Sequence, residues 1–230
     1  MGKEVVSDMV GREAFIMKNI KAVLFDFDGV LGRTMEDNYR AWVHAFSTRG
    51  LPFEREPYFL IEGFNSRRVA EHFLGDSAVD DGLIDELIGL KETHYAENAT
   101  FSLYDGVEDL IRRLKACGLK LALVSGASSK RLEASVKGGF LSFFDAVITG
   151  DRVINCKPHP EPYLTAAKAL VCAPAECAAV ENAPMGIKSA KGAGMYCVAI
   201  TSTLPEDALA LADRTFTSIT ELKSFFCDDA

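Results

Sequence analysis

The sequence predicts an α/β fold in which a doubly wound parallel sheet carries an inserted α-helical cap domain. Short apolar runs without polar alternation, such as residues 22–25, are typical of strands that are buried on both faces. From residue 104 onward such runs alternate with segments of helical periodicity, which indicates a parallel sheet, whereas residues 34–100 show helical patterns and no convincing strand. The expected units are an N-terminal extension that is poorly ordered (1–16), an α/β core (17–33 and 102–230) and a helical cap (34–101).

The cap segment follows the first strand directly. Apolar residues recur at helical spacing from Tyr39 to Phe46, and Gly50 supplies an end to the helix. The cap helices are therefore expected at about 36–49, 66–74 and 80–97.

The second half of the chain supplies the other strands and helices of the core. Gly118 ends the helix before the second strand, and Pro162 begins a later helix, because Gly and Pro favour these two positions. Helices are expected at about 106–116, 128–137, 162–170 and 184–192, strands at 119–125, 145–149, 176–182 and 195–200, and a final strand and helix within 213–227. In such a sheet, ligands bind in the crevice beyond the carboxyl ends of the strands.

Composition and charge argue against several classes of protein. The formal charge of −8 and the pI near 5.1 do not suit a nucleic-acid-binding protein, which needs a basic surface. The sequence shows neither a signal peptide nor a run of about 20 apolar residues, so we expect a cytoplasmic protein without a membrane partner. The six cysteines match no zinc-binding spacing, and we expect reduced thiols. The oligomeric state stays open, with a monomer favoured.

The stretch KAVLFDFDGVL, residues 21–31, places two aspartates at the end of the first buried strand. Asp26 and Asp28 lie two residues apart, so their side chains project to the same side. Carboxylates this close repel each other and imply a cation, a shared proton or both. Taken alone, the pair would be better interpreted as part of a polar loop, and the later strand ends reverse that interpretation.

Polar residues also follow the later strands. Ser125 and Gly126 end the second strand, Lys157 lies in the loop after the third, and Glu181 and Asn182 end the fourth. Because the carboxyl ends of parallel strands lie at one edge of the sheet, we expect these residues around one crevice. Such groups suit Mg²⁺ and a phosphoryl group, since hard cations take oxygen ligands and phosphate oxygens need donors. Singly, Ser125 could equally belong to a helix N-cap and Lys157 could be a solvated loop lysine.

The stretches DFDGV, SGAS, KPHPEPY and ENAPMGIKSAKGAGM resemble, in this order, the four motifs of the haloacid dehalogenase superfamily, in the branch similar to β-phosphoglucomutase and phosphoglycolate phosphatase. The resemblance extends from about residue 20 to 200 and includes the position of the cap. It implies that Asp26 is the nucleophile, which forms an aspartyl phosphate, and that Asp28 is the general acid and base. It also adds Ser125 and Lys157 to the catalytic residues, assigns phosphate binding to Ser125, Gly126 and Lys157, and assigns Mg²⁺ binding to Asp26, Asp28, Glu181 and Asn182.

Two positions depart from the family pattern. The fourth motif usually carries two consecutive acids, the second a direct Mg²⁺ ligand, whereas here Glu181 is followed by Asn182. The lost charge predicts a weaker Mg²⁺ site, although Asn182 could instead fix the turn before Pro184. Asn38 replaces a histidine that assists the acid and base residue in the mutases, which weakens a mutase interpretation. Asn38 and Arg67 are candidate substrate contacts, and for Arg67 a solvated helix charge is an equal alternative.

The sequence therefore predicts a Mg²⁺-dependent phosphatase that hydrolyses a small phosphomonoester, a sugar phosphate or a similar metabolite, through an aspartyl-phosphate intermediate. The cap is expected to close over the site and exclude bulk water, on hinges near Gly32-Arg33 and Thr100 to Tyr104. One alternative is a β-phosphoglucomutase-like sugar-phosphate mutase with the same core. The other, of a different class, is a non-catalytic protein that binds a phosphorylated metabolite, and the intact motif residues argue against it.

Overall fold

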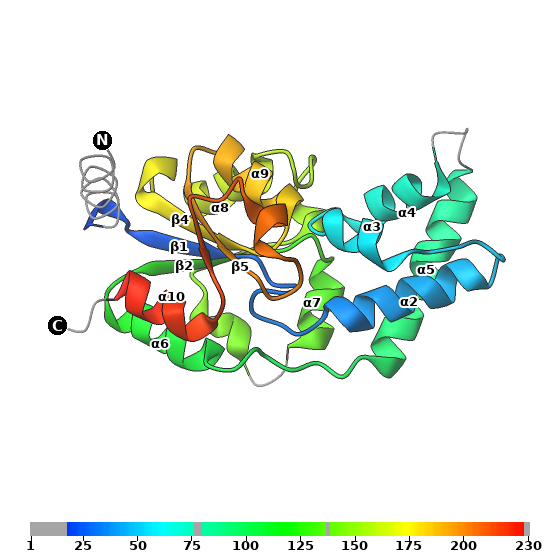
Figure 1. Cartoon of the computed structure of the whole chain (residues 1–230), viewed down its shortest axis with the longest axis horizontal. Helices are drawn as coiled ribbons and strands as arrows, with labels where there is room; N and C mark the ends of the chain where they lie inside the picture. The colour runs from blue at the N-terminus through cyan, green and yellow to red at the C-terminus, as the bar shows by residue number, and fades with distance from the viewer. Residues whose placement is uncertain (1–17, 76–79, 137–138, 228–230) are drawn as a thin grey trace.

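A six-stranded parallel sheet with the strand order β3-β2-β1-β4-β5-β6 lies at the centre of the described part of the molecule (Figure 1). The structure is a computed structural model that describes residues 18–75, 80–136 and 139–227. The strands are β1 (Ala22–Phe25), β2 (Lys120–Val124), β3 (Ala146–Ile148), β4 (Cys177–Glu181), β5 (Tyr196–Ile200) and β6 (Arg214–Phe216). The predicted doubly wound sheet is confirmed, and its strand order is that of a Rossmann-like fold.

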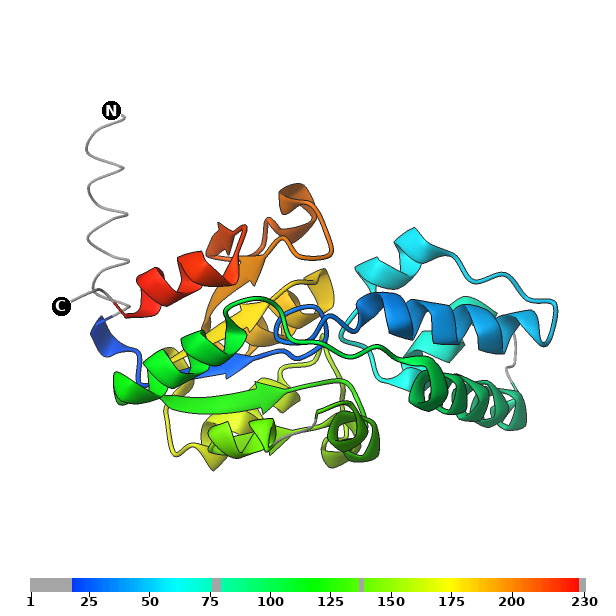
Figure 2. The same ribbon diagram turned by 90° about the horizontal axis from the view of Figure 1, so that it is seen from below.

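Helices cover both faces of this sheet, which explains why its strands lack polar alternation. Along β1, Val23 and Phe25 pack into one apolar cluster and Ala22 and Leu24 into another, because successive side chains point to opposite faces. Figures 1 and 2 show α6 and α10 on one face and α8 and α9 on the other. The core helices are α6 (Val107–Ala116), α7 (Ser129–Ser135), α8 (Glu161–Ala169), α9 (Pro184–Gly192) and α10 (Ile219–Phe226).

In the described part of the chain, four helices between β1 and α6 form the cap: α2 (Met35–Ser47), α3 (Arg55–Leu60), α4 (Ser66–Leu74) and α5 (Asp81–Asn98). Figure 2 shows this group of helices beside the sheet, with α2 and α5 packed along each other. The cap has an apolar cluster of its own, in which the Phe53 ring centroid lies 5.8 Å from that of Trp42 and 3.9 Å from that of Phe73. The sequence does not predict α3, because its six residues are too short to show a helical repeat.

The chain crosses between core and cap twice, and the two crossings lie side by side. Gly32 forms an antiparallel bridge with Leu103, and the Arg33 N–H donates to the Ser102 carbonyl at 2.8 Å. Both crossings fall where the sequence predicts hinges. The hinge motion and the domain boundaries at 33/34 and 101/102 stay predictions.

The expectation that all cysteines are reduced is wrong for one pair. Cys117 and Cys227 form a disulfide, with their Cα atoms 6.7 Å apart. Cys117 ends α6 and Cys227 ends α10, and these two helices pack against each other, so the fold brings together residues that are 110 positions apart in sequence. The free cysteines of the described residues are Cys156, Cys172, Cys177 and Cys197.

No helix within the described ranges has both the length and the apolar character needed to cross a membrane. The predicted N-terminal extension, residues 1–16, lies outside the described residues. The cytoplasmic location and the monomeric state stay predictions.

Candidate active site

The candidate site lies where the strand order reverses, between β1 and β4. Open α/β sheets bind ligands at such a point, beyond the carboxyl ends of the strands. Asp26 follows β1 and Asn182 follows β4, while Ser125 follows β2, the other neighbour of β1. The Asp26 N–H still donates to the Val180 carbonyl at 3.0 Å. The backbone of the sheet therefore holds side chains from three adjacent strands at one edge.

Lys157 joins two of these strand ends. Its Nζ lies 2.6 Å from Asp26 Oδ1 and 2.7 Å from Glu181 Oε1, and it donates to the Val124 carbonyl at 3.1 Å. The side chain is only 1 % exposed, which excludes a solvated loop lysine. Glu181 Oε1 also accepts a hydrogen bond from the Tyr163 hydroxyl. Although burial opposes the charge, the two carboxylates hold the pKa of Lys157 above its usual value, so Lys157 is a fixed cation.

Asp26 has one carboxylate oxygen with a partner and one without. Lys157 binds Oδ1, whereas Oδ2 is buried and has no hydrogen-bond partner among the residues that the structure describes. Burial raises the pKa of Asp26 to about 8, a shift that Lys157 opposes and that Glu181 and Asp28 increase. A positive group at Oδ2 would favour the ionised carboxylate, which is the nucleophilic form.

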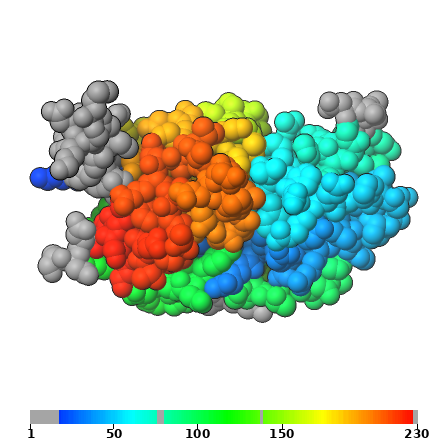
Figure 3. All heavy atoms as spheres, in the orientation of Figure 1, coloured from blue at the N-terminus to red at the C-terminus, as the bar shows by residue number. Residues whose placement is uncertain are grey.

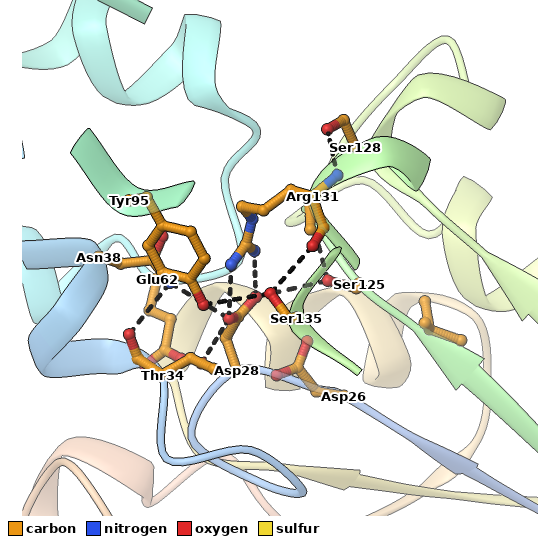
Figure 4. A network of polar contacts seen from close by, with 12 residues as sticks. Asp26, Asp28, Thr34, Asn38, Glu62, Tyr95, Ser125, Ser128, Arg131 and Ser135 are labelled. Atoms are coloured by element: carbon orange, nitrogen blue, oxygen red, sulfur yellow. Dashed lines mark hydrogen bonds and ion pairs between the residues drawn. The ribbon is translucent and has the colours of Figure 1, made fainter. Parts of the chain in front are cut away.

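Asp28 is in the opposite situation, because both of its carboxylate oxygens are occupied (Figure 4). Arg131 Nη1 lies 3.0 Å from Oδ1 and Nη2 lies 2.5 Å from Oδ2, which makes a bidentate ion pair. Thr34 and Asn38 donate to Oδ1 at 2.5 and 3.2 Å, and Ser125 donates to Oδ2 at 3.4 Å. Burial pushes the pKa of Asp28 upward, but Arg131 outweighs it and holds the pKa below its usual value. The Asp28 side chain, predicted as part of the Mg²⁺ site, is thus used by other partners.

Asn182 faces a residue of the cap. Its Nδ2 donates to Glu62 Oε2 at 2.8 Å and to Thr203 Oγ1 at 2.9 Å, so these bonds do not fix the turn before Pro184. Asn182 is completely buried and Glu62 is 6 % exposed. The other oxygen of each side chain, Asn182 Oδ1 and Glu62 Oε1, has no hydrogen-bond partner within the described ranges.

Three buried side-chain oxygens in the described part of the chain thus have no partner: Asp26 Oδ2, Glu62 Oε1 and Asn182 Oδ1. A buried oxygen without a partner is destabilising, and hard cations such as Mg²⁺ take oxygen ligands. No three His, Cys, Asp or Glu side chains of the described residues form a group that could hold a metal, and the set here consists instead of two carboxylates and one amide. These donors fit a hard cation. Glu181 Oε1 is bound by Lys157 and Tyr163, and the role of Glu181 as a metal ligand stays a prediction.

The cap closes over the site, and Figure 3 shows it packed against the core. The loop after α3 lies directly on the strand ends, since a Cβ atom at Gly126 would be 2.9 Å from the Phe64 carbonyl oxygen. The cavity that remains measures about 40 Å³, and its lining includes Asp26, Asp28 and Gly126 from the core and Asn38, Glu62 and Lys91 from the cap. A cavity of this size holds a few waters. This space is too small for a phosphomonoester.

The two predicted substrate contacts are placed differently. Asn38 lies in the cavity, where it donates to Asp28. Arg67 does not line this cavity, is paired with Asp81 at 2.8 Å and Asp85 at 2.6 Å, and lines a separate pocket between cap and core that also includes Lys157. The structure therefore favours the alternative in which Arg67 is a solvated helix charge.

Three charged residues of the cavity lining, Glu62, Lys91 and Arg131, are not predicted from the motifs. Lys91 is 2 % exposed, its Nζ lies 5.8 Å from the centre of the Trp42 ring, and burial lowers its pKa to about 8. A sequence signal exists for two of them. Glu62 is the lone charge in the apolar stretch YFLIEGF, and Lys91 follows the buried Leu87 by one helical turn. Arg131 has no such signal, because it lies in the first turn of α7, where charged residues are common.

Comparison with known protein families agrees with the geometry of this site. Residues 23–200 match the family model of the haloacid dehalogenase-like hydrolases. The chain belongs to this family. The predicted family and the prediction of a hydrolase are thus confirmed.

The relatives of this haloacid dehalogenase-like hydrolase include phosphatases and a mutase. Validoxylamine A 7'-phosphate phosphatase from Streptomyces hygroscopicus subsp. limoneus is 32% identical over 207 residues, which cover 88% of this chain and 96% of that protein. Beta-phosphoglucomutase from Bacillus subtilis is 29% identical over 211 residues, which cover 88% of this chain and 92% of that protein. The structure of CbbY from Rhodobacter sphaeroides in complex with xylulose-(1,5)bisphosphate has a TM-score of 0.76 and 28% identity, and the match covers 88% of this chain and 96% of that chain.

Proposed function

We propose that this protein is a Mg²⁺-dependent phosphatase that hydrolyses a small phosphomonoester, a sugar phosphate or a similar metabolite, through an aspartyl phosphate on Asp26. The observation that carries the proposal is the buried Asp26 carboxylate, which has Lys157 on one oxygen and no protein partner on the other. Asp26 and Asn182 of the core would contribute oxygen ligands to Mg²⁺. When bound, Mg²⁺ would supply positive charge next to the oxygens of the phosphoryl group.

The reaction proceeds in two steps on the residues of this chain. An oxygen of ionised Asp26 attacks phosphorus, the bond from phosphorus to the ester oxygen breaks, and the leaving oxygen takes the electron pair and a proton from Asp28. A water molecule then attacks the phosphorus of the aspartyl phosphate and gives a proton to Asp28. The bond between phosphorus and Asp26 breaks, inorganic phosphate leaves, and both aspartates return to their first state. Lys157 offsets the negative charge at Asp26 throughout.

Arg131 must release Asp28 before Asp28 can donate a proton. A carboxylate in a bidentate pair with a guanidinium is ionised and has no proton to give. Arg131 lines the cavity, so the oxygens of an entering phosphomonoester can accept its hydrogen bonds in place of Asp28. Substrate entry then frees the Asp28 carboxylate, which takes up a proton from solvent water before it acts as the acid of the first step.

A sugar-phosphate mutase is the second candidate, because the relatives include one. In a mutase the phosphoryl group passes from Asp26 to a second sugar hydroxyl rather than to water. Asn38 occupies the position where the mutase-like pattern has a histidine. Its Nδ2 donates to Asp28 Oδ1, and the two atoms are 3.2 Å apart. An amide cannot take up and release a proton near neutral pH, so this contact favours the phosphatase.

The test is a screen of the purified protein for phosphate release from a panel of phosphorylated metabolites and one aryl phosphate. We expect release that requires Mg²⁺, stops with EDTA and falls by about 10⁴-fold or more in Asp26→Asn. Asp105→Asn, which changes an aspartate that is 98% exposed, is the matched control and should keep the wild-type rate. Phosphoryl transfer to a sugar without free phosphate would indicate the mutase. Tight metabolite binding with no turnover of any ester would indicate the binding protein.

A further inference from the structure

We propose that Glu62 of the cap supplies the carboxylate that the fourth motif lacks at Asn182, so that the cation site is complete only while the cap is closed. The inference rests on the proposed function, because it takes a cation at Asp26 as given. It adds a ligand from the cap and a link between cation binding and cap closure.

Glu62 is a carboxylate in an apolar part of the cap. It follows α3, whose residues Tyr58 and Phe59 pack into the apolar cluster of the cap, and it is 6 % exposed. Burying a carboxylate is costly unless a partner compensates. Within the described ranges, its one hydrogen-bonding partner is Asn182, across the boundary between cap and core. The cap therefore places a carboxyl group against the core where its own packing gives no reason for one.

Two glycines, which lack a side chain, leave the space in which the cap and the core meet here. A Cβ atom at Gly29 would lie 3.1 Å from Glu62 Oε1 and 2.1 Å from Asn182 Nδ2. A Cβ atom at Gly63, the residue after Glu62, would lie 3.1 Å from Lys157 Cδ. Glu62 and Asn182 thus fill the space beside the loop that follows Asp28, and the turn after Glu62 packs on the lysine that binds Asp26.

Glu62 and Asn182 are complementary, because one side chain accepts the hydrogen bond that the other donates. The Asn182 Nδ2 donates to Glu62 Oε2 at 2.8 Å, and an aspartate at position 182 would turn this contact into repulsion between like charges. An asparagine at 182 removes one negative charge from the core and at the same time admits one from the cap. Compared with the family pattern of two consecutive acids, the cation site therefore has the same number of carboxylates, but one of them comes from the cap instead of the core.

The oxygens that would hold the cation come from three separate segments. Asp26 Oδ2 follows β1, Asn182 Oδ1 follows β4, and Glu62 Oε1 follows α3. All three are buried and have no hydrogen-bond partner in the described part of the chain. Two carboxylates and an amide oxygen are ligands of the kind that Mg²⁺ takes in proteins.

Cation binding and cap closure are linked as a result. A cation that contacts Asp26 and Glu62 together binds the closed form more tightly than the open form, and by reciprocity it shifts the population toward the closed form. Without a cation, Asp26 Oδ2 and Glu62 Oε1 are buried in the closed form without a partner among the described residues, a cost that opening of the cap removes. The cation therefore holds the cap shut in addition to its role at the phosphoryl group.

The test is a calorimetric titration of the substrate-free protein with Mg²⁺. Glu62→Gln keeps the size of the side chain and removes its charge, and we expect Mg²⁺ binding to weaken about 10-fold or more. Glu56→Gln makes the same change at an exposed position of α3 and should leave the affinity unchanged. Thermal unfolding without Mg²⁺ verifies that both variants are folded.

The Asn182→Asp variant tests whether Glu62 and Asn182 are complementary. It restores the core carboxylate, so adding Glu62→Gln to it should change Mg²⁺ affinity by less than about 3-fold, in contrast to the effect in the wild-type background. Hydrogen exchange of residues 61–65 reports on the cap. Mg²⁺ should slow this exchange in the wild type and in Glu56→Gln but not in Glu62→Gln.

Equal Mg²⁺ affinity in the wild type and in Glu62→Gln would overturn the inference, as would a wild type that binds no Mg²⁺. The two proposals can fail separately. Binding of Mg²⁺ that depends on Glu62, without phosphatase activity, would contradict only the proposed function. A Mg²⁺-dependent phosphatase whose Mg²⁺ affinity ignores Glu62 would contradict only the role of Glu62.

Discussion

Around Asp26 the protein leaves one carboxylate oxygen without a partner, whereas around Asp28 it supplies donors for both carboxylate oxygens. The Asp26 side of the cavity holds Lys157, Asn182 and the cap residue Glu62. Two carboxyl groups, those of Asp26 and Glu62, lie there with one cation, Lys157. The Asp28 side is neutralised by Arg131 of the same chain. The Asp26 side thus has a free oxygen for a group from outside the protein, and the Asp28 side would have to rearrange when such a group binds.

The pKa shifts of the two aspartates point the same way. Burial raises the pKa of Asp26 to about 8, and Arg131, against the effect of burial, holds the pKa of Asp28 below its usual value. The proposed reaction needs the reverse, an ionised Asp26 and a protonated Asp28. In the proposed reaction, the substrate-free closed protein is therefore a resting state, which the cation and the substrate would convert to the reactive state.

The largest effect is expected from breaking the Asp28 side. Arg131→Met leaves the Asp28 carboxylate buried without its cation, and loss of one partner of a buried pair costs about 3–5 kcal/mol of unfolding free energy. Chemical denaturation at neutral pH measures this loss. Arg112→Met, in which an exposed arginine of α6 is removed, should cost less than about 1 kcal/mol. Equal losses in the two variants would contradict a special role of the buried pair.

The same pair predicts how stability depends on pH. The pKa of Asp28 is lower in the folded chain than its ordinary value of 3.8, so the unfolded chain binds more protons in acid. The stability that the pair contributes is complete above that ordinary value and is lost as the pH falls through the lower pKa of the folded state. The difference in unfolding free energy between the wild type and Arg131→Met should therefore shrink below about pH 4. If the difference in unfolding free energy between the two proteins stays constant down to pH 2, the lost stability comes from packing and not from the ion pair.

Lys91 of α5 brings a positively charged side chain from the cap to the cavity. Burial lowers its pKa to about 8, so its charge is lost as the pH rises past that value, and the KM for an anionic substrate should rise with it. Lys91→Met should raise KM about 10-fold at pH 7, the effect of one charge-assisted hydrogen bond. Lys91→Arg should keep KM low up to pH 9. A KM that is the same in all three proteins would remove Lys91 from substrate binding.

The smallest effect is expected at Arg67 of α4. Arg67→Ala removes two exposed ion pairs, which contribute less than about 1 kcal/mol each. Because Arg67 does not line the cavity, KM should stay within about 2-fold of the wild-type value. Steady-state kinetics measures this, and a 10-fold increase would return Arg67 to the substrate contacts.

The strand ends were predictable from the sequence because their signal is local. An apolar run followed by Asp26, Ser125 or Asn182 marks both the strand and its end, and parallel topology then places these ends at one edge. The strand order is not local, since no residue pattern says that β1 pairs with β4. Glu62 and Arg131 also escaped prediction, because their partners in the site lie 120 and 103 residues away in sequence. Contacts between cap and core depend on packing that periodicity does not report.

In the proposed reaction Asp26 is the nucleophile and Asp28 is the proton carrier, and a pre-steady-state experiment on Asp28→Asn with an aryl phosphate separates these two roles. An aryl leaving group departs without a proton, so Asp26 should still be phosphorylated, while the water step, which needs Asp28 as base, should stall. We predict a burst of about one aryl alcohol per protein and then no further turnover. Borohydride reduction and peptide mass spectrometry should then find homoserine at position 26. Steady turnover at the wild-type rate, or a phosphoryl group on any other residue, would contradict the account.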